Sequence, residues 1–268
     1  MIGYDLINED LNEIGEYLKA DDYVSAYDMI SELLSEHKDK FKEGDEIRYF
    51  NFDSPIQFYI YNMKLSPEKN FKQGGIDFRT LYMCKAHIEI FYENYKEAEE
   101  SLKKALYWNP VDPNIFYELA RVFIKTGELQ KLLIVLKAVR SYILDKVSYS
   151  KYYAYMGEYY RLKEDYKTAL SLYLLSKDIF EIPVSNEGIT FILGKEDIKN
   201  PPVTEEIIST LKKDGLEYSL DMEVLGMIYD LSYELTKQLN NKSAMYCLDV
   251  LYELTGDEKY LREKEYLE

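Results

Sequence analysis

Apolar and aromatic positions recur along most of the chain at spacings of three and four residues, the periodicity of amphipathic α-helices. In the clearest segment, Tyr153 and Tyr160 mark one helix, and Ala169 and Tyr173 mark the next. Small residues such as Gly157 and Ala169 would let two helices approach closely, while the tyrosines would fill the space between helix pairs. The pattern predicts an all-α chain of antiparallel helical hairpins.

The same arrangement recurs upstream. A unit that begins near residue 113 reads Phe116-x-x-Leu119-Ala120-x-x-Phe123, with Gly127 at the turn between its helices. A unit that begins near residue 79 is less regular, because Lys85 and Glu89 stand where an apolar residue and an aromatic residue are expected. The starts near 79, 113 and 150 lie 34 and 37 residues apart, so the second interval implies a short insertion around residues 144–149.

On these motifs the chain resembles the tetratricopeptide repeat (TPR) family, whose period is about 34 residues. The resemblance covers three repeats, at about 79–112, 113–146 and 150–183, and more loosely two divergent hairpins, at about 7–38 and 218–255. It implies a right-handed superhelix of antiparallel helical hairpins, an α-α solenoid, with residues 1–268 in a single domain. Divergent terminal repeats are usual in such arrays.

Two irregular stretches interrupt the repeats, at 39–77 and 180–216. In the first, we expect residues 47–52 to be extended, Asp53-Ser54-Pro55 to start a short helix, and residues 64–75 to form a loop. The aromatic residues Tyr49, Phe50 and Phe52 are either a peptide-binding ledge or, as we favour, part of the packed core.

The second stretch contains Pro183 and Pro201-Pro202, which break helices. Ser185 and Thr204 are the predicted N-caps of two short helices, the second of which ends at Asp214-Gly215. Asp112 is a further predicted N-cap, before a proline at the first helical position.

The charge of the chain bears on its partners. There are 33 basic and 49 acidic residues, a formal net charge of −16, which disfavours binding to phosphate backbones and hence to nucleic acid. A basic peptide or protein surface would be attracted instead, although the acidity can equally serve solubility alone.

No segment approaches the ~20 apolar residues of a membrane span, and the N-terminus lacks a basic segment followed by an apolar one. Two distant cysteines, Cys84 and Cys247, exclude a disulfide framework and fit a reducing compartment. We therefore expect a cytoplasmic protein with no membrane partner.

No catalytic motif is present, so we expect no enzyme activity, no catalytic residues, no metal site and no cofactor. The histidines, His37 and His87, have no neighbours at metal-ligand spacing. Both cysteines are interpreted as small core residues.

The TPR resemblance implies a peptide-binding groove lined by the first helix of each hairpin. Carried onto this sequence, its inward-facing positions include Met83, His87, Asn114, Tyr117, Arg121, Ile124, Lys151, Glu158 and Arg161. The basic residues among them can also be ordinary surface partners of Glu118 or Glu158.

The leading hypothesis is a scaffold or adaptor whose concave face binds a protein or peptide, the chain being a monomer or a weak homo-oligomer. The alternative is a self-associating structural protein whose groove is filled by its own or a neighbouring chain.

Overall fold

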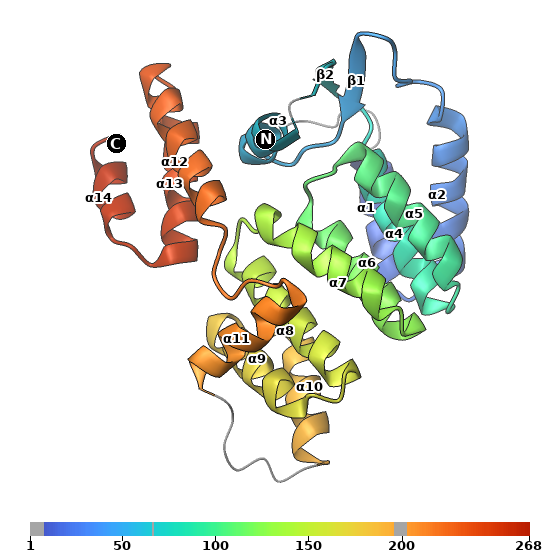
Figure 1. The fold of residues 1–268 in the computed structure, drawn as a ribbon. Helices are drawn as coiled ribbons and strands as arrows, with labels where there is room; N and C mark the ends of the chain where they lie inside the picture. The colour runs from blue at the N-terminus through green and yellow to red at the C-terminus, as the bar shows by residue number, and fades with distance from the viewer. Residues whose placement is uncertain (1–7, 66, 196–202) are drawn as a thin grey trace. The chain divides into compact units, whose positions relative to one another are not determined.

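A computed structural model describes residues 8–65, 67–195 and 203–268, and it is 73% helical (Figure 1). The prediction of an all-α protein is confirmed. The elements of the described residues are α1 (Asn8–Lys19), α2 (Tyr23–His37), β1 (Ile47–Phe50), α3 (Pro55–Leu65), β2 (Asn70–Gln73), α4 (Phe78–Phe91), α5 (Tyr95–Trp108), α6 (Pro113–Thr126), α7 (Leu129–Val139), a 3-10 turn (Arg140–Tyr142), α8 (Lys146–Leu162), α9 (Tyr166–Ile179), α10 (Pro183–Leu193), α11 (Thr204–Asp214), α12 (Met222–Lys237), α13 (Asn241–Thr255) and α14 (Lys259–Glu265).

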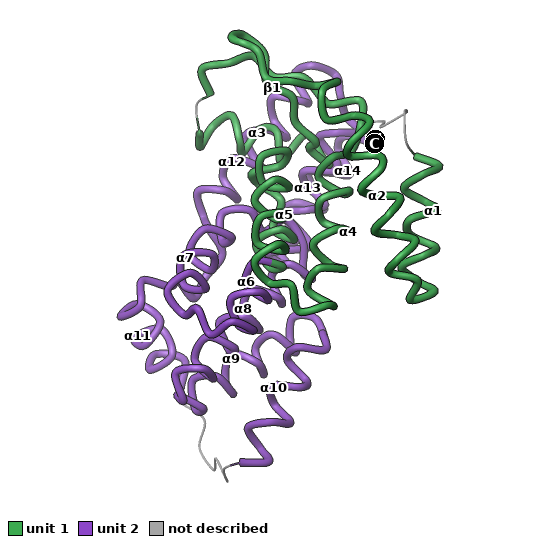
Figure 2. The backbone as a smooth tube through the Cα atoms, turned by 90° about the vertical axis from the view of Figure 1, so that its right-hand side faces the viewer, with its two compact units in different colours: residues 1–118 green, residues 119–268 purple. Residues whose placement is uncertain are grey.

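The chain divides into two compact units, residues 1–118 and 119–268, which are coloured separately in Figure 2. In unit 1, α1 and α2 form one hairpin and α4 and α5 another, and α2 packs against α4. The small residues Ala26 of α2, Ala86 of α4 and Ala98 of α5 are all fully buried. In unit 2, α8 and α9 form a hairpin against which α10 packs, and α12 and α13 form another.

The same backbone conformation recurs in five hairpin turns. The residue with positive φ is Asp21, Glu93, Gly127, Glu164 or Leu239 in the turns after α1, α4, α6, α8 and α12. In each turn the next backbone N–H donates to the carbonyl oxygen five residues earlier, at 2.8–3.0 Å. This is the Schellman ending of a helix. Its recurrence in the three predicted repeats and in both divergent hairpins confirms the prediction of repeated helical hairpins.

The stretch 39–77 is only partly irregular. Residues 47–50 are extended as predicted, but they pair in parallel with β2, from Ile47 with Asn70 to Phe50 with Gln73. The prediction of a loop over 64–75 is therefore wrong at β2, and also at residues 64–65, which belong to α3. Phe50 and Phe52 are buried, so these two side chains belong to the core and form no ledge.

The starts of α8 and α10 differ most from the predictions. Helix α8 begins at Lys146, because Asp145 accepts a hydrogen bond from the Ser148 N–H at 2.7 Å. The predicted insertion at 144–149 is thus mostly an extra turn of this helix. Ser185 is not an N-cap: it lies inside α10, and its hydroxyl donates to the Ile182 carbonyl oxygen.

Other helix ends follow the sequence. Asp112 accepts from the Asn114 N–H at 2.9 Å, and α11 ends at Asp214, followed by the C-cap Gly215, whose φ is +69°. Helix α11 begins at Thr204, one residue after its N-cap, so the predicted cap is off by one. The helix break at Pro201-Pro202 lies outside the described residues.

Candidate binding surface

The predicted groove residues of unit 1 differ in accessibility. On α4, Met83 is half-buried and His87 is exposed; at the start of α6, Asn114 is exposed. Tyr117 is only 1% exposed, so its ring contributes to the interior and offers almost no surface to a ligand.

In unit 2, Arg121, Ile124 and Lys151 are half-buried. Arg161 donates from Nε and Nη2 to the same Glu158 oxygen, at 3.0 and 2.5 Å. The interpretation of Arg161 as an ordinary partner of Glu158 is therefore confirmed.

The other oxygen of Glu158 accepts a hydrogen bond from the Tyr173 hydroxyl at 2.6 Å. The Tyr173 ring is fully buried against Gly157 of α8 and Gly188 of α10, where an added Cβ would approach ring atoms to 2.6 and 2.3 Å. Glu158 is thus held by the packing of α8, α9 and α10. Sequence reasoning identified Gly157 as a contact between helices but missed Gly188.

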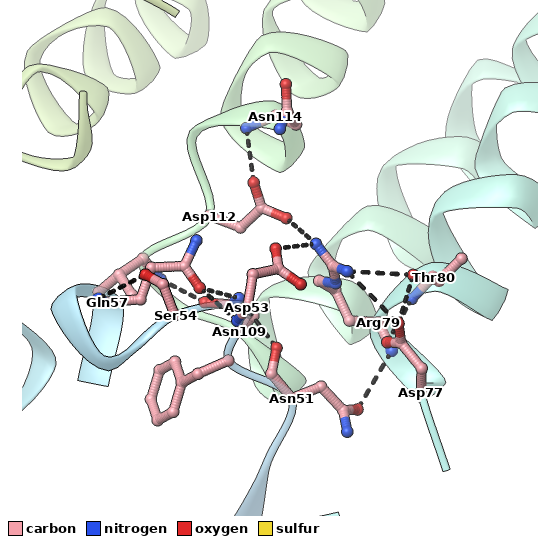
Figure 3. Close-up of polar contacts among 12 residues, drawn as sticks. Asn51, Asp53, Ser54, Gln57, Asp77, Arg79, Thr80, Asn109, Asp112 and Asn114 are labelled. Atoms are coloured by element: carbon pink, nitrogen blue, oxygen red, sulfur yellow. Dashed lines mark hydrogen bonds and ion pairs between the residues drawn. The ribbon is translucent and has the colours of Figure 1, made fainter. Parts of the chain in front are cut away.

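A group of charged side chains in unit 1 surrounds Arg79 (Figure 3). Its Nη1 donates to Asp53 at 2.6 Å and to Asp112 at 2.7 Å, and its Nη2 lies 3.4 Å from Asp77. Asp112 is 1% exposed. Nearby, the Asn109 amide donates to the Asn51 carbonyl oxygen at 2.9 Å. These bonds join residues 51–57 to the ends of α4, α5 and α6, so we assign the group a structural role.

An open pocket of about 360 Å³ lies in unit 1 between the start of α2, the end of α4 and the start of α5. We call it the α2/α4 pocket. Tyr23, Tyr27 and Tyr92 contribute aromatic rings to its wall, and Asp28, Glu89 and Glu97 contribute carboxylates. Ligand pockets typically have volumes of ~300–1,000 Å³ and a few polar groups in an apolar lining.

Exposed apolar side chains surround the mouth of this pocket. Tyr23 stacks on Phe91 with ring centroids 4.2 Å apart, and Tyr92 meets Tyr23 edge-on at 6.3 Å. Phe91 and Tyr92 remain 54% and 50% exposed, and Val24 is exposed beside them. We call Tyr23, Val24, Phe91 and Tyr92 the apolar rim. Contiguous exposed apolar surface of this kind is typical of interaction sites.

A buried ion pair lies beside the pocket. Lys85 donates to Glu89 and, at 2.8 Å, to the Tyr27 hydroxyl, and its Nζ lies 4.6 Å from the Tyr27 ring centroid. Burial opposes the charge on Lys85, but the hydrogen bonds to Glu89 and Tyr27 outweigh it and raise the pKa of the ammonium. Glu89 is 3% exposed, and its Oε2 has no hydrogen-bond partner.

The pocket was not predicted from the sequence, although the sequence contains an indication of it. Lys85 and Glu89 are the two residues that depart from the repeat pattern in α4. Of the predicted groove residues, His87 lies next to the pocket, with its ring centroid 6.4 Å from that of Tyr23.

Across residues 8–65, 67–195 and 203–268, no group of three or more His, Cys, Asp and Glu side chains is arranged to hold a metal ion. Burial raises the pKa of the Cys84 thiol to about 11 and that of Cys247 to about 12. Within the same residues, every helix is too short or too polar to cross a membrane.

No family model matches the chain, and no curated protein matches it. Among solved structures it is similar to a tetratricopeptide repeat protein from Parabacteroides merdae, with 12% sequence identity, a TM-score of 0.39 and 97% of each chain covered. The fold described above rests on the hairpins and their shared turns.

Proposed function

We propose that the protein is an interaction module that binds a segment of another protein, with the α2/α4 pocket and its apolar rim as the docking surface. The observation that carries this proposal is the apolar rim, where Phe91 and Tyr92 stay half exposed at the mouth of an open pocket. Aromatic side chains in this position are the type most often found at binding hot spots.

The repeated hairpins support the same proposal, because stacked hairpins present one helix face of each unit to solvent. The groove positions that remain accessible on α4, Met83 and His87, extend the proposed surface from the pocket along that helix. Of the predicted positions on α6 and α8, the accessible ones stay a prediction: Asn114, Arg121, Ile124 and Lys151.

The test is capture of a partner from a lysate of the native cells, followed by affinity measurement with two purified variants. Phe91→Ser removes the centre of the apolar rim. It should weaken binding of the captured partner by about 2 kcal/mol, roughly a 30-fold increase in the dissociation constant. Tyr233→Ser removes an aromatic residue that is 60% exposed on α12, and it should leave the affinity unchanged. The reverse result would place the docking surface elsewhere.

Self-association is the second candidate, and one observation favours it. Helix α12 exposes Met222 and Tyr233, which are 70% and 60% accessible, on the C-terminal hairpin. A second copy of the chain could bury them. A mass measurement in solution separates the two: a stable oligomer that Tyr233→Ser dissociates would favour self-association.

A further inference from the structure

We infer that the α2/α4 pocket receives an arginine side chain of the segment that docks on the apolar rim. This inference rests on the proposed function and specifies its chemistry. The three observations behind it are an unsatisfied buried carboxylate, aromatic faces beside it, and the charge balance of the lining.

The carboxylate is that of Glu89, which lines the pocket and is almost completely buried. One of its oxygens accepts from Lys85, but Oε2 is buried without a hydrogen-bond partner. Leaving a buried charged acceptor unpaired is unfavourable, so a ligand that brings a donor gains affinity there. A guanidinium carries five N–H donors in a planar fork that matches carboxylates.

The aromatic faces suit the same group. Lys85 already places a cation over the Tyr27 ring, at 4.6 Å from its centroid, so this wall of the pocket accepts positive charge. Tyr23 and Tyr92 stand edge to face at the mouth. Arginine stacks its flat guanidinium on such rings and forms cation–π contacts more often than lysine does.

The charge balance favours a cation over a neutral group. Among the described residues that line the pocket, three are carboxylates, Asp28, Glu89 and Glu97, and none is basic. Lys85 compensates one of them from outside the lining. The whole chain carries a net charge of −16, which attracts a basic partner over a longer range.

The direct test uses N-acetyl-arginine methylamide as the probe and N-acetyl-citrulline methylamide as its uncharged isostere. Both are titrated into the isotopically labelled protein and followed by amide chemical shifts in NMR. The arginine compound should shift residues 23–28 and 88–97, and the citrulline compound should bind about tenfold more weakly, a difference of about 1.4 kcal/mol.

Matched variants on α5 give an independent readout. Glu97 lines the pocket, whereas Glu100, one turn further along, pairs with Lys103 outside it, and both side chains are exposed. Glu97→Gln should weaken binding of the arginine compound by about threefold or more. Glu100→Gln makes the same change in charge and should leave this affinity unchanged. Because both sites are exposed, neither substitution should affect folding.

Equal binding of arginine and citrulline compounds would overturn the inference, as would shifts confined to other residues or no shift with the arginine compound. A failure of this kind is distinguishable from failure of the proposed function. If Phe91→Ser still releases the captured partner, the docking surface stands and only its preference for arginine is lost.

Discussion

At the scale of single residues, the packing of α8, α9 and α10 depends on the ring of Tyr173, which touches the backbone of two glycines. Gly157 and Gly188 leave room for this ring, and the bond from its hydroxyl to Glu158 fixes its far end. The ring therefore has little freedom to move away from an added side chain. The interior here is sensitive to volume, as close-packed protein cores are.

Gly157→Leu should destabilise the protein by about 1–3 kcal/mol or more, because the new side chain overlaps Tyr173. Gly226 is the matched control: it lies three residues before Tyr229 in α12, as Gly157 lies three residues before Tyr160 in α8, and nothing lies within 4 Å of an added Cβ. Gly226→Leu should be neutral or stabilise by up to ~1 kcal/mol through helix propensity. Urea unfolding of both variants measures the difference, and equal destabilisation would show that the assigned contact is absent.

The two thiols give a second residue-scale prediction. Since burial raises the pKa of Cys84 to about 11 and of Cys247 to about 12, both thiols are protonated at pH 8. The thiolate is the reactive form, so neither should react with Ellman's reagent in the folded protein, and both should react in urea. Reaction of the folded protein at the rate of a free thiol would contradict this account of their environment.

At the scale of elements, each hairpin ends its first helix with one residue in the left-handed conformation. Of the five turns described above, the one after α6 has glycine there, Gly127, and the other four do not. The turn after α12 has Leu239 at φ +58°, and this residue is 88% exposed. A side chain with a Cβ costs about 1–2 kcal/mol in this conformation. The sequence therefore keeps the turn geometry without always supplying the residue that suits it best.

Leu239→Gly should stabilise the protein by up to ~1 kcal/mol, since the relief of strain exceeds the entropy lost by glycine on folding. Gly127→Leu makes the reverse change in the equivalent turn and should destabilise it by a similar amount. Thermal unfolding of the pair checks this, and a destabilising Leu239→Gly would mean that the exposed leucine makes a contact that outweighs the strain.

Arg79 and its three carboxylate partners, Asp53, Asp77 and Asp112, form the Arg79 cluster, which connects the segment 39–77 to the starts of α4 and α6. Arg79→Gln would leave Asp112 buried without its cation, which should cost about 3–5 kcal/mol. Arg262→Gln on α14, where the side chain is 65% exposed, is the control and should cost less than about 1 kcal/mol. Denaturant unfolding measures both, and a mild effect of Arg79→Gln would show that the cluster is not needed for stability.

The sequence predicts those parts of the fold that depend on contacts between residues close together in the chain. It predicts much less of the parts that depend on contacts between distant residues. The hairpins of the three repeats between residues 79 and 183 could be predicted from the periodicity of apolar positions and from small residues such as Ala86 and Gly157. By contrast, β2 has no apolar alternation, and its pairing with β1 joins segments more than twenty residues apart. Arg79 contacts the carboxylates of Asp53, Asp77 and Asp112. The separations of these residues along the sequence do not match the period of a helix or a strand, so their contact could not be predicted.

At the scale of the whole molecule, the chain is acidic and built of helical hairpins, and the function we propose for it is binding to another protein. Chelators, nucleotides and duplex DNA at physiological salt should therefore leave its melting temperature unchanged. A ligand of the folded state at 100 times its dissociation constant adds about 2.7 kcal/mol, which a thermal shift assay detects. A clear shift with any of the three would support an enzyme or a nucleic-acid-binding protein instead.

The most direct test of the central claim is hydrogen–deuterium exchange of the chain alone and in complex with its captured partner. The docking surface consists of the start of α2, the end of α4 and the start of α5. Binding there should slow amide exchange in residues 23–28 and 88–97 and leave α12 and α13 unchanged. Slowing confined to α12 and α13, with exchange at the α2/α4 pocket unaltered, would contradict the account.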